Sequence, residues 1–325
     1  MRKDKKQEIP HGGEILTRPV SLSGRLAAIA GLARSGACVC DVGCDHAHIP
    51  IRLLQEGRFD RAIGMDVIEG PLEKAAGNLA LYGMEDRVEL RLSNGLDACR
   101  AGEADTLIVT GMGGTLMEEI LLREPDKTAS FSALVLGPQS DPDKVRAAIR
   151  RLGAQIVEER LVFEDGKYYP VLRAEFPAGD CPAGTGLPPG SAPDRYDGRI
   201  PAPDQSGGRM SAPDQSDSRR TGKPAETCHS LQREKAGNSL SVFAAQVPAG
   251  HRQEAADMFG MYLLQRRDPV LQEYLTRQTR VLEKILQSVS RAATERDDLR
   301  EKHLEKEREI RHRLEVFRAA LTCYE

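Results

Sequence analysis

The stretch 41-DVGCDHAHIP-50 decides the fold, because it joins an apolar run at residues 37–42 to a helical pattern at residues 49–55. In open α/β sheets the ligand-binding loop lies at the carboxyl end of a strand, which is where Gly43 stands. Gly43 lets the backbone approach a ligand closely, and the dinucleotide fingerprint G-x-G-x-x-G is absent. The stretch therefore predicts a strand, a binding loop and a helix, and it favours a ligand without phosphates over a bound diphosphate.

Outward from this loop, strand-like apolar runs alternate with helical patterns. After an opening helix at about 22–33, we expect strands at 37–42, 62–66, 88–92, 106–110 and 134–136, and helices at 49–55, 71–82, 142–152 and one ending at 122. Two more strands, at 155–163 and 169–176, follow each other through a short turn, which suggests an antiparallel pair at one edge. The alternation predicts an α/β, Rossmann-like and mostly parallel sheet with helices on both faces.

The rest of the chain differs in composition. We expect a polar N-terminal tail at 1–20, the α/β domain at 21–177, a low-complexity insertion at 178–249 and a helical domain at 250–325. In the insertion the tripeptide Ala-Pro-Asp recurs and aliphatic residues are few. Because so little apolar surface could be buried, folding would not offset the entropy lost on ordering the chain, and we expect this segment to be disordered. The last region spaces apolar residues among charges of both signs, which is typical of coiled-coil-like helices.

Three further strand ends carry residues suited to a nucleoside. Asp66 ends the second strand, and its carboxylate can accept from both ribose hydroxyls, although an acidic strand end is also a common solvated cap. Asn94, in Ser-Asn-Gly after the third strand, could accept from an adenine amine, or the motif could be a turn. The bare loop at 111–114 exposes amides on which a flat base could lie, or it is a tight strand-to-helix connection. All four loops follow strands and so fall on one sheet edge, which describes a class I methyltransferase site.

The motifs resemble those of the bacterial tRNA (adenine-22-N1)-methyltransferase family. They are, in order, DVGCDHAHIP, GMDVIEGPLEKA, SNGL, VTGMGG, GPQSDPDKVR and EDGKYYPVLRAE. The resemblance extends over about 22–175, and the charged C-terminal helices are similar to the family's coiled-coil domain. It implies S-adenosylmethionine as the methyl donor and N1 of an adenine in the D-arm region of tRNA as the acceptor.

The resemblance also implies roles for individual residues. The donor would be bound by Asp41, Gly43, Asp45, His46, Asp66, Asn94, Gly95, Gly111, Met112 and Gly113. We expect the tRNA to be bound by Gly113, Gly114, Pro138 and Gln139, and by the cations Arg25 and Lys144, which are chosen from the charge pattern and not from the resemblance. Two positions depart from the family: Asn94 stands where Asp is common, and Gly137 stands before Pro138 where Gln is common, which leaves Gln139 as the candidate for contacting the base.

Methylation of adenine N1 needs little chemistry from the protein. The neutral N1 carries an in-plane lone pair and can attack the methyl group in line, so catalysis rests on positioning and charge placement. The product base is cationic, and a nearby carboxylate would stabilise it. Asp41 and Asp45 are the candidates, with Met112 on the platform beside the transferred methyl.

The charge balance argues against a uniformly basic coat. Residues 21–177 hold 18 Lys and Arg against 24 Asp and Glu, and residues 251–325 hold 15 against 14. Because phosphate contacts dominate RNA affinity, binding must use a local patch, and we expect it to be weak and salt-sensitive. The candidates are Arg25, Lys144, Arg146, Arg150, Arg151 and the C-terminal arginines, each of which could instead lie on a solvated helix face.

Other functions stay open at this stage. The same donor site could serve a non-RNA acceptor, or the helices could form a partner-binding coiled coil on a non-catalytic domain. A metal site would rest on three cysteines and two histidines around the first loop, but Cys38 and Cys40 share a strand face and are expected in the core, so we expect no metal.

The compartment follows from the absence of export signals. No run of about eighteen apolar residues predicts a membrane span, and the N-terminus has no apolar signal core. Seven cysteines in a chain of 325 residues favour a reduced, cytoplasmic protein. The sequence leaves the oligomeric state open between a monomer and a weak dimer.

Overall fold

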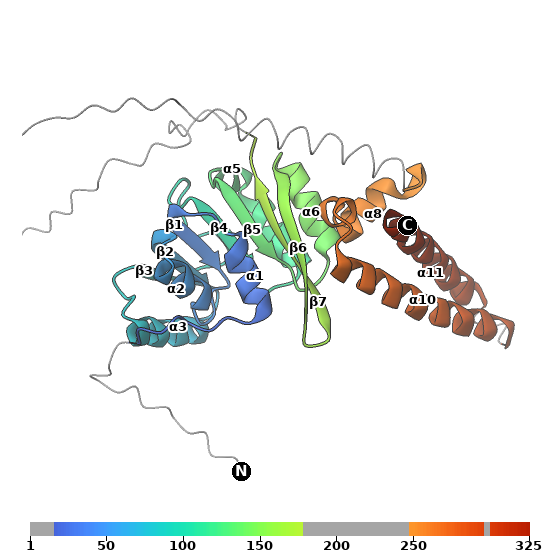
Figure 1. The fold of residues 1–325 in the computed structure, drawn as a ribbon, viewed down its shortest axis with the longest axis horizontal. Coiled ribbons are helices and arrows are strands. Elements are labelled where there is room, and N and C mark those ends of the chain that lie inside the picture. The colour runs from blue at the N-terminus through green and yellow to red at the C-terminus, as the bar shows by residue number, and fades with distance from the viewer. Residues whose placement is uncertain (1–15, 178–246, 296–299) are drawn as a thin grey trace, which may run out of the picture.

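The computed structural model describes residues 16–177, 247–295 and 300–325 (Figure 1). The expected disordered insertion lies outside the described residues, apart from its last three positions. Of these, Val247 is buried against the C-terminal helices, so that domain begins a few residues earlier than expected. In the part of the chain that is described, none of the helices combines the length and the apolar character that crossing a bilayer requires.

One mixed sheet of seven strands organises the first domain, in the order β3-β2-β1-β4-β5-β7-β6. The strands are β1 (Gly36–Val42), β2 (Phe59–Asp66), β3 (Val88–Leu92), β4 (Thr106–Thr110), β5 (Ala133–Gly137), β6 (Gln155–Glu164) and β7 (Lys167–Glu175). The first five run parallel, and β7 pairs antiparallel with both β5 and β6. The expected Rossmann-like sheet with an antiparallel pair at one edge is confirmed.

Helices cover both faces of the sheet. They are α1 (Gly24–Leu32), α2 (His48–Gln55), α3 (Glu69–Tyr82), α4 (Gly114–Arg123), α5 (Pro125–Ala129) and α6 (Pro142–Arg151). Alternate residues of β1 enter two cores: Val39 packs with α1, α2 and α3, whereas Cys38 and Cys40 pack with α4 and α6. The two cysteines therefore share one buried face, as expected. The short helix α5 was not predicted from the sequence.

The packed domain also begins before residue 21. Val20 is buried, and its N–H donates to the Gln55 side chain at 2.8 Å. The Leu16 N–H donates to the Leu81 carbonyl at 2.9 Å. Residues 16–20 therefore belong to the fold and not to the polar tail.

The C-terminal domain is a cluster of short helices followed by a long hairpin. Its elements are the 3-10 turn η1 (Ala249–His251), α8 (Arg252–Phe259), α9 (Met261–Gln265), α10 (Pro269–Glu295), α11 (Arg300–Leu321) and the 3-10 turn η3 (Thr322–Tyr324). Helices α10 and α11 lie side by side and run in opposite directions, away from the sheet and back (Figure 1). The Tyr324 hydroxyl closes the hairpin's base by donating to the Asp268 carbonyl at 3.0 Å.

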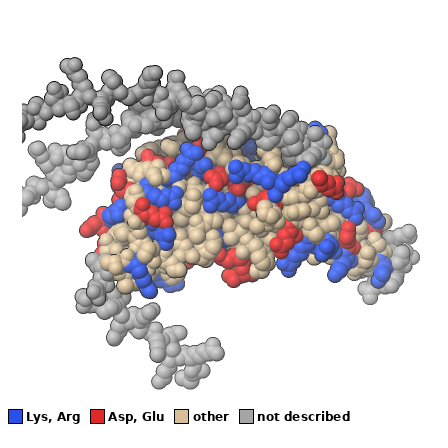
Figure 2. All heavy atoms as spheres, viewed as in Figure 1, with Lys and Arg blue, Asp and Glu red and all other residues tan. Residues whose placement is uncertain are grey.

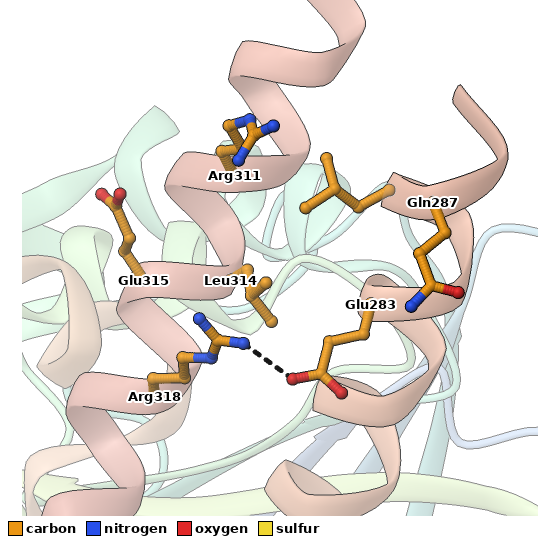
Figure 3. A pocket seen from close by; sticks show the side chains of 7 residues that line it. Glu283, Gln287, Arg311, Leu314, Glu315 and Arg318 are labelled. Carbon is orange, nitrogen blue, oxygen red and sulfur yellow. Dashed lines mark hydrogen bonds and ion pairs between the residues drawn. The ribbon is translucent and has the colours of Figure 1, made fainter. Parts of the chain in front are cut away.

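The hairpin is only partly a coiled coil. Phe317 is buried in its base, whereas Val281 and Ile285 of α10 are 42% and 43% exposed. A hollow of about 370 Å³ lies between part of α10 and part of α11, with an ion pair from Arg318 to Glu283 at 2.8 Å across it (Figure 3).

A buried arginine links the two domains and corrects one expectation. Arg146 of α6, proposed for RNA contact, is 3% exposed and pairs with Glu159 of β6. Its guanidinium also donates to the carbonyls of Asp257, at 2.6 Å, and Met258, at 3.0 Å, in α8. Arg150 pairs with the Asp257 carboxylate. Arg146 is therefore not available to RNA, because a guanidinium buried against a carboxylate and two carbonyls has its donors taken up by protein.

Candidate active site

The carboxyl ends of four parallel strands lie level with one another. Val42 of β1 is in register with Met65 of β2 and with Val109 of β4, and Asp66 of β2 is in register with Leu92 of β3. Loop hydrogen bonds extend this alignment past the strands: Gly43 N–H donates to the Met65 carbonyl at 2.9 Å. The four predicted loops therefore share one edge of one sheet.

Gly43 holds the first loop against the glycine-rich loop after β4. Its φ of +78° is left-handed, and a Cβ at this position would lie 2.6 Å from the Thr110 carbonyl oxygen. The Met112 methyl would be 3.3 Å from the same point. Any side chain at Gly43 would push the two loops apart, so glycine is required here for both conformation and space.

The glycine-rich loop is clasped from its other side by the loop after β5. The Gln139 N–H donates to the Met112 carbonyl at 3.0 Å, and the Gly114 N–H donates to the Ser140 carbonyl at 2.8 Å. A Cβ on Gly114 would lie 2.1 Å from the Asp141 carbonyl oxygen. Close packing against this backbone explains why a glycine is needed at the buried position 114. The rest of the loop is more accessible: Gly111 is exposed, and Met112 and Gly113 are half-buried. The loop is thus both a tight connection and a partly bare platform.

Asp41 is a buried carboxylate beneath the first loop. It is 1% exposed, and its Oδ1 has no hydrogen-bond partner among the described residues. Burial, and to a lesser degree the negative charge of Asp66, raise the pKa of Asp41 to about 7. A buried acceptor without a partner is costly, so this carboxylate is arranged to receive a donor or a positive charge.

The other two carboxylates of the edge face solvent. The Asp45 side chain is 61% exposed, and its backbone φ of +43° is left-handed. Asp66 is half-buried at the end of β2, where its Oδ1 accepts from the Ile68 N–H at 3.1 Å. Beside it, Val67 and Ile68 are 62% and 60% exposed, an apolar surface that the sequence analysis missed although both follow the acidic strand end directly.

Two histidines shape the far side of the first loop. The rings of His46 and His48 stack with centroids 5.3 Å apart, and the Asn78 amide donates to the His46 carbonyl at 2.9 Å. His46 Nε2 lies 3.6 Å from the Asp45 carboxylate. Burial lowers the pKa of His48. Among the described residues, these histidines and the neighbouring cysteines form no group with the ligand spacing of a metal site.

The remaining predicted residues lie on the same rim with differing exposure. Asn94 is exposed, whereas Gly95 is buried with φ +62° over Ile120, so the Asn-Gly pair is also a turn. Pro138 is buried and Gln139 is exposed. The structure therefore leaves Asn94 and Gln139 free to contact a ligand at this edge.

Two of the predicted cationic residues, Arg25 and Lys144, also lie near this edge. Arg25 stacks over the Tyr169 ring, with its guanidinium carbon 4.9 Å from the ring centroid. Lys144 Nζ donates to the Thr115 hydroxyl at 2.7 Å, beside the glycine-rich loop. The hollow between α10 and α11 lies elsewhere, in the C-terminal hairpin, and is not part of this site (Figure 3).

Comparisons with known proteins agree with this geometry. The family model described as a methyltransferase domain matches residues 22–172. The tRNA (adenine(22)-N(1))-methyltransferase of Bacillus subtilis (strain 168) is 32% identical over 161 residues, which are 50% of this chain and 67% of the relative. A crystal structure of the B. subtilis m1A22 tRNA methyltransferase has a TM-score of 0.64 at 21% identity, covering 93% of this chain and 99% of that chain.

A second solved structure carries a ligand. It is a putative tRNA (m1A22) methyltransferase of Streptococcus pneumoniae in complex with S-adenosyl-L-methionine, with a TM-score of 0.57 and 24% identity, covering 90% of this chain and 100% of that chain. The two structural comparisons show that the fold is shared. The sequence identity to the B. subtilis relative shows which family the chain belongs to. The chain belongs to the tRNA (adenine(22)-N(1))-methyltransferase family.

Proposed function

We propose that this protein transfers a methyl group from S-adenosylmethionine to N1 of adenine 22 in tRNA. The family membership supports the reaction, and the S. pneumoniae relative was solved with this donor. The observation that carries the proposal is the buried, unpartnered Asp41 carboxylate beneath a glycine loop, one strand away from Asp66.

The residues at the edge fit this donor. Asp41 supplies a buried negative charge suited to the ammonium of the donor's amino-acid part. Asp66 supplies an accessible carboxylate for the ribose hydroxyls, with Val67 and Ile68 as an apolar surface beside it for a flat ring. Gly43, Gly111 and Gly113 bring no side chains to the loops of this edge, and Asn94 and His46 are accessible for contact with the donor.

The mechanism rests on placement. The bound donor supplies an electrophilic methyl group on a sulfonium. Adenine N1 attacks through its own lone pair, so no residue has to remove a proton first. The exposed Asp45 carboxylate would stabilise the cationic product base, whereas the burial of Asp41 suits it to the donor. Met112 and Gln139, on two loops joined by a hydrogen bond, would position the base.

Binding of tRNA would use few cations. On the face drawn in Figure 2, Lys and Arg are interspersed with Asp and Glu and do not form one continuous basic surface. Arg25 and Lys144 border the edge, and Arg151 is exposed on α6. Arg146 and Arg150 are engaged by the C-terminal domain, which leaves that domain's own arginines as the second group of contacts. The adenine must be unpaired before N1 is accessible.

The direct test is methyl transfer in vitro. The full chain, labelled donor and unmodified tRNA should yield 1-methyladenosine on nucleoside analysis, and tRNA carrying guanine at position 22 should not be labelled. Asp45→Asn should lower turnover at least tenfold with donor affinity nearly unchanged, because it removes charge only near the product. Asp126→Asn, on α5, is the matched control and should keep full turnover. Label in a protein or small molecule and none in tRNA would refute the proposal in favour of a non-RNA acceptor.

The setting of the enzyme follows from its substrate. We expect it to act in the reducing cytoplasm, where its five described cysteines, all free and buried, would stay thiols. Sedimentation of the full chain would decide between a monomer and a weak dimer.

A further inference from the structure

Three potential metal ligands meet in the C-terminal domain, away from the sheet edge. His251 ends η1, Glu254 lies in the first turn of α8, and His312 lies on α11. One ligand atom of each lies within 4.8 Å of the others. His312 Nε2 is 2.9 Å from both carboxylate oxygens of Glu254. Residues 58 positions apart in the sequence are thus brought to one point.

A second observation concerns His251 itself. Its Nδ1 is buried and has no hydrogen-bond partner among the described residues. Its ring centroid lies 6.0 Å from that of His312. An ion pair between Glu254 and His312 alone does not explain why the Nδ1 of His251 is buried beside them without a hydrogen-bond partner among the described residues. A buried imidazole nitrogen without a partner among the described residues, next to a histidine–carboxylate pair, is what an incomplete coordination sphere presents.

The chemistry of the set selects a class of cation. Two imidazoles and one carboxylate suit Zn²⁺ and neighbouring divalent transition metals, whereas Mg²⁺ and Ca²⁺ prefer oxygen ligands alone. Ligand atoms around a tetrahedral Zn²⁺ lie roughly 3.3 Å apart, given bonds of about 2.0–2.1 Å. None of the three side chains is fully enclosed, since Glu254 and His251 are half-buried and His312 is exposed, so packing leaves them room to approach this spacing.

We propose that His251, Glu254 and His312 form a binding site for Zn²⁺ or a similar divalent transition metal, which ties α8 to α11. Helix α8 is the element that Arg146 and Arg150 bind from the methyltransferase domain. A metal here would fix the long hairpin relative to that domain. The site is independent of methyl transfer, and the expectation of no metal, which rested on residues around the first loop, does not cover it.

The test uses the full chain after removal of metals by a chelator. Titration with ZnCl₂ in a calorimeter should show one site per chain, and Co²⁺ should give the visible absorption bands of a low-symmetry, nitrogen-ligated site. His312→Ala, Glu254→Gln and His251→Ala should each weaken Zn²⁺ binding at least tenfold. His303→Ala, which removes a histidine from the same helix outside the group, should leave it unchanged.

A thermal melt gives an independent readout. Zn²⁺ should raise the melting temperature of the wild-type protein and of His303→Ala but not that of His312→Ala, because a ligand stabilises only the state that binds it. His312 is exposed, so its replacement should leave the far-UV circular dichroism intact. The proposal is overturned if millimolar Zn²⁺ leaves the wild-type melt and heat signal unchanged. It is equally overturned if the His312 and Glu254 variants bind as the wild type does.

Discussion

Asp41 makes donor binding depend on pH in a direction that can be calculated. Its pKa of about 7 compares with about 3.9 for an aspartate in a peptide, so burial and Asp66 disfavour its charged form by on the order of 4 kcal/mol. A cationic ligand group beside Asp41 favours the charged form. Below pH 7, donor binding must therefore release a proton, and affinity should rise with pH until Asp41 is ionised in the free protein.

The size of this effect follows from the fraction ionised. With a pKa of about 7, roughly 3% of Asp41 is charged at pH 5.5 and roughly three quarters at pH 7.5. Calorimetric titration with S-adenosylhomocysteine, which keeps the ammonium of the donor, should then give a Kd about 25-fold tighter at pH 7.5 than at pH 5.5. Asp41→Asn should bind weakly with a flat pH response. Asp45→Asn and His48→Gln, the neighbouring titratable positions, should keep the wild-type slope.

Stability should change in the opposite sense. Because the folded protein holds the Asp41 proton more tightly than the unfolded chain, the free energy of unfolding contributed by this group is full below about pH 4 and is lost as pH rises to about 7. Asp41→Asn should therefore stabilise the ligand-free protein at pH 8 relative to the wild type. A wild-type Kd that does not change between pH 5.5 and 7.5, or an Asp41→Asn variant with the wild-type slope, would refute the assignment.

Three other predictions concern packing and charge. Gly43→Ala should weaken donor binding at least tenfold, because the added methyl group meets the Thr110 carbonyl. The control Gly57→Ala has a similar positive φ but open space around it, so it should lower the free energy of unfolding by only about 1 kcal/mol and leave donor binding unchanged. Equal donor affinities of the two variants would contradict this prediction. Arg146→Met should lower the free energy of unfolding by about 3–5 kcal/mol in urea titrations, since it leaves Glu159 buried without its partner. The control Arg151→Met removes one partner of an exposed ion pair and should lower the free energy of unfolding by less than about 1 kcal/mol. Similar losses in the two variants would show that the buried pair contributes no more to stability than the exposed one. The Kd for tRNA should rise at least tenfold between 50 and 300 mM salt in a filter-binding assay, and an unchanged Kd would exclude phosphate contacts as the main source of affinity.

Much of the sheet could be predicted from the sequence because its strands are short apolar runs separated by polar loops. The boundaries of β3 and β4 were predicted to the residue, and those of β1 and β5 to within one residue at each end. The start of β2 was placed three residues late, because Asp60 and Arg61 are exposed there and interrupt the apolar pattern. Helix α5 was missed because a five-residue turn has no apolar periodicity.

The candidate site could be predicted in its position and less well in its details. Each loop follows a strand, and parallel strands present their carboxyl ends on one edge, so convergence followed from topology. The burial of Asp41 and the fit of Gly114 against Asp141 depend on contacts between loops distant in the sequence. Arg146 was misjudged for a similar reason: helical spacing placed it among charged neighbours, but α8, more than a hundred residues later, covers it.

We propose that the donor lies on the carboxyl edge of the sheet with its ribose at Asp66. Calorimetric titration of S-adenosylhomocysteine into the wild-type protein, Asp66→Ala and the matched control Asp60→Ala, at the exposed start of the same strand, tests this claim directly. This placement of the donor predicts one site per chain in the wild type and the control, with affinity at least tenfold weaker in Asp66→Ala. Absence of binding in the wild type, or equal affinity in all three proteins, would contradict it.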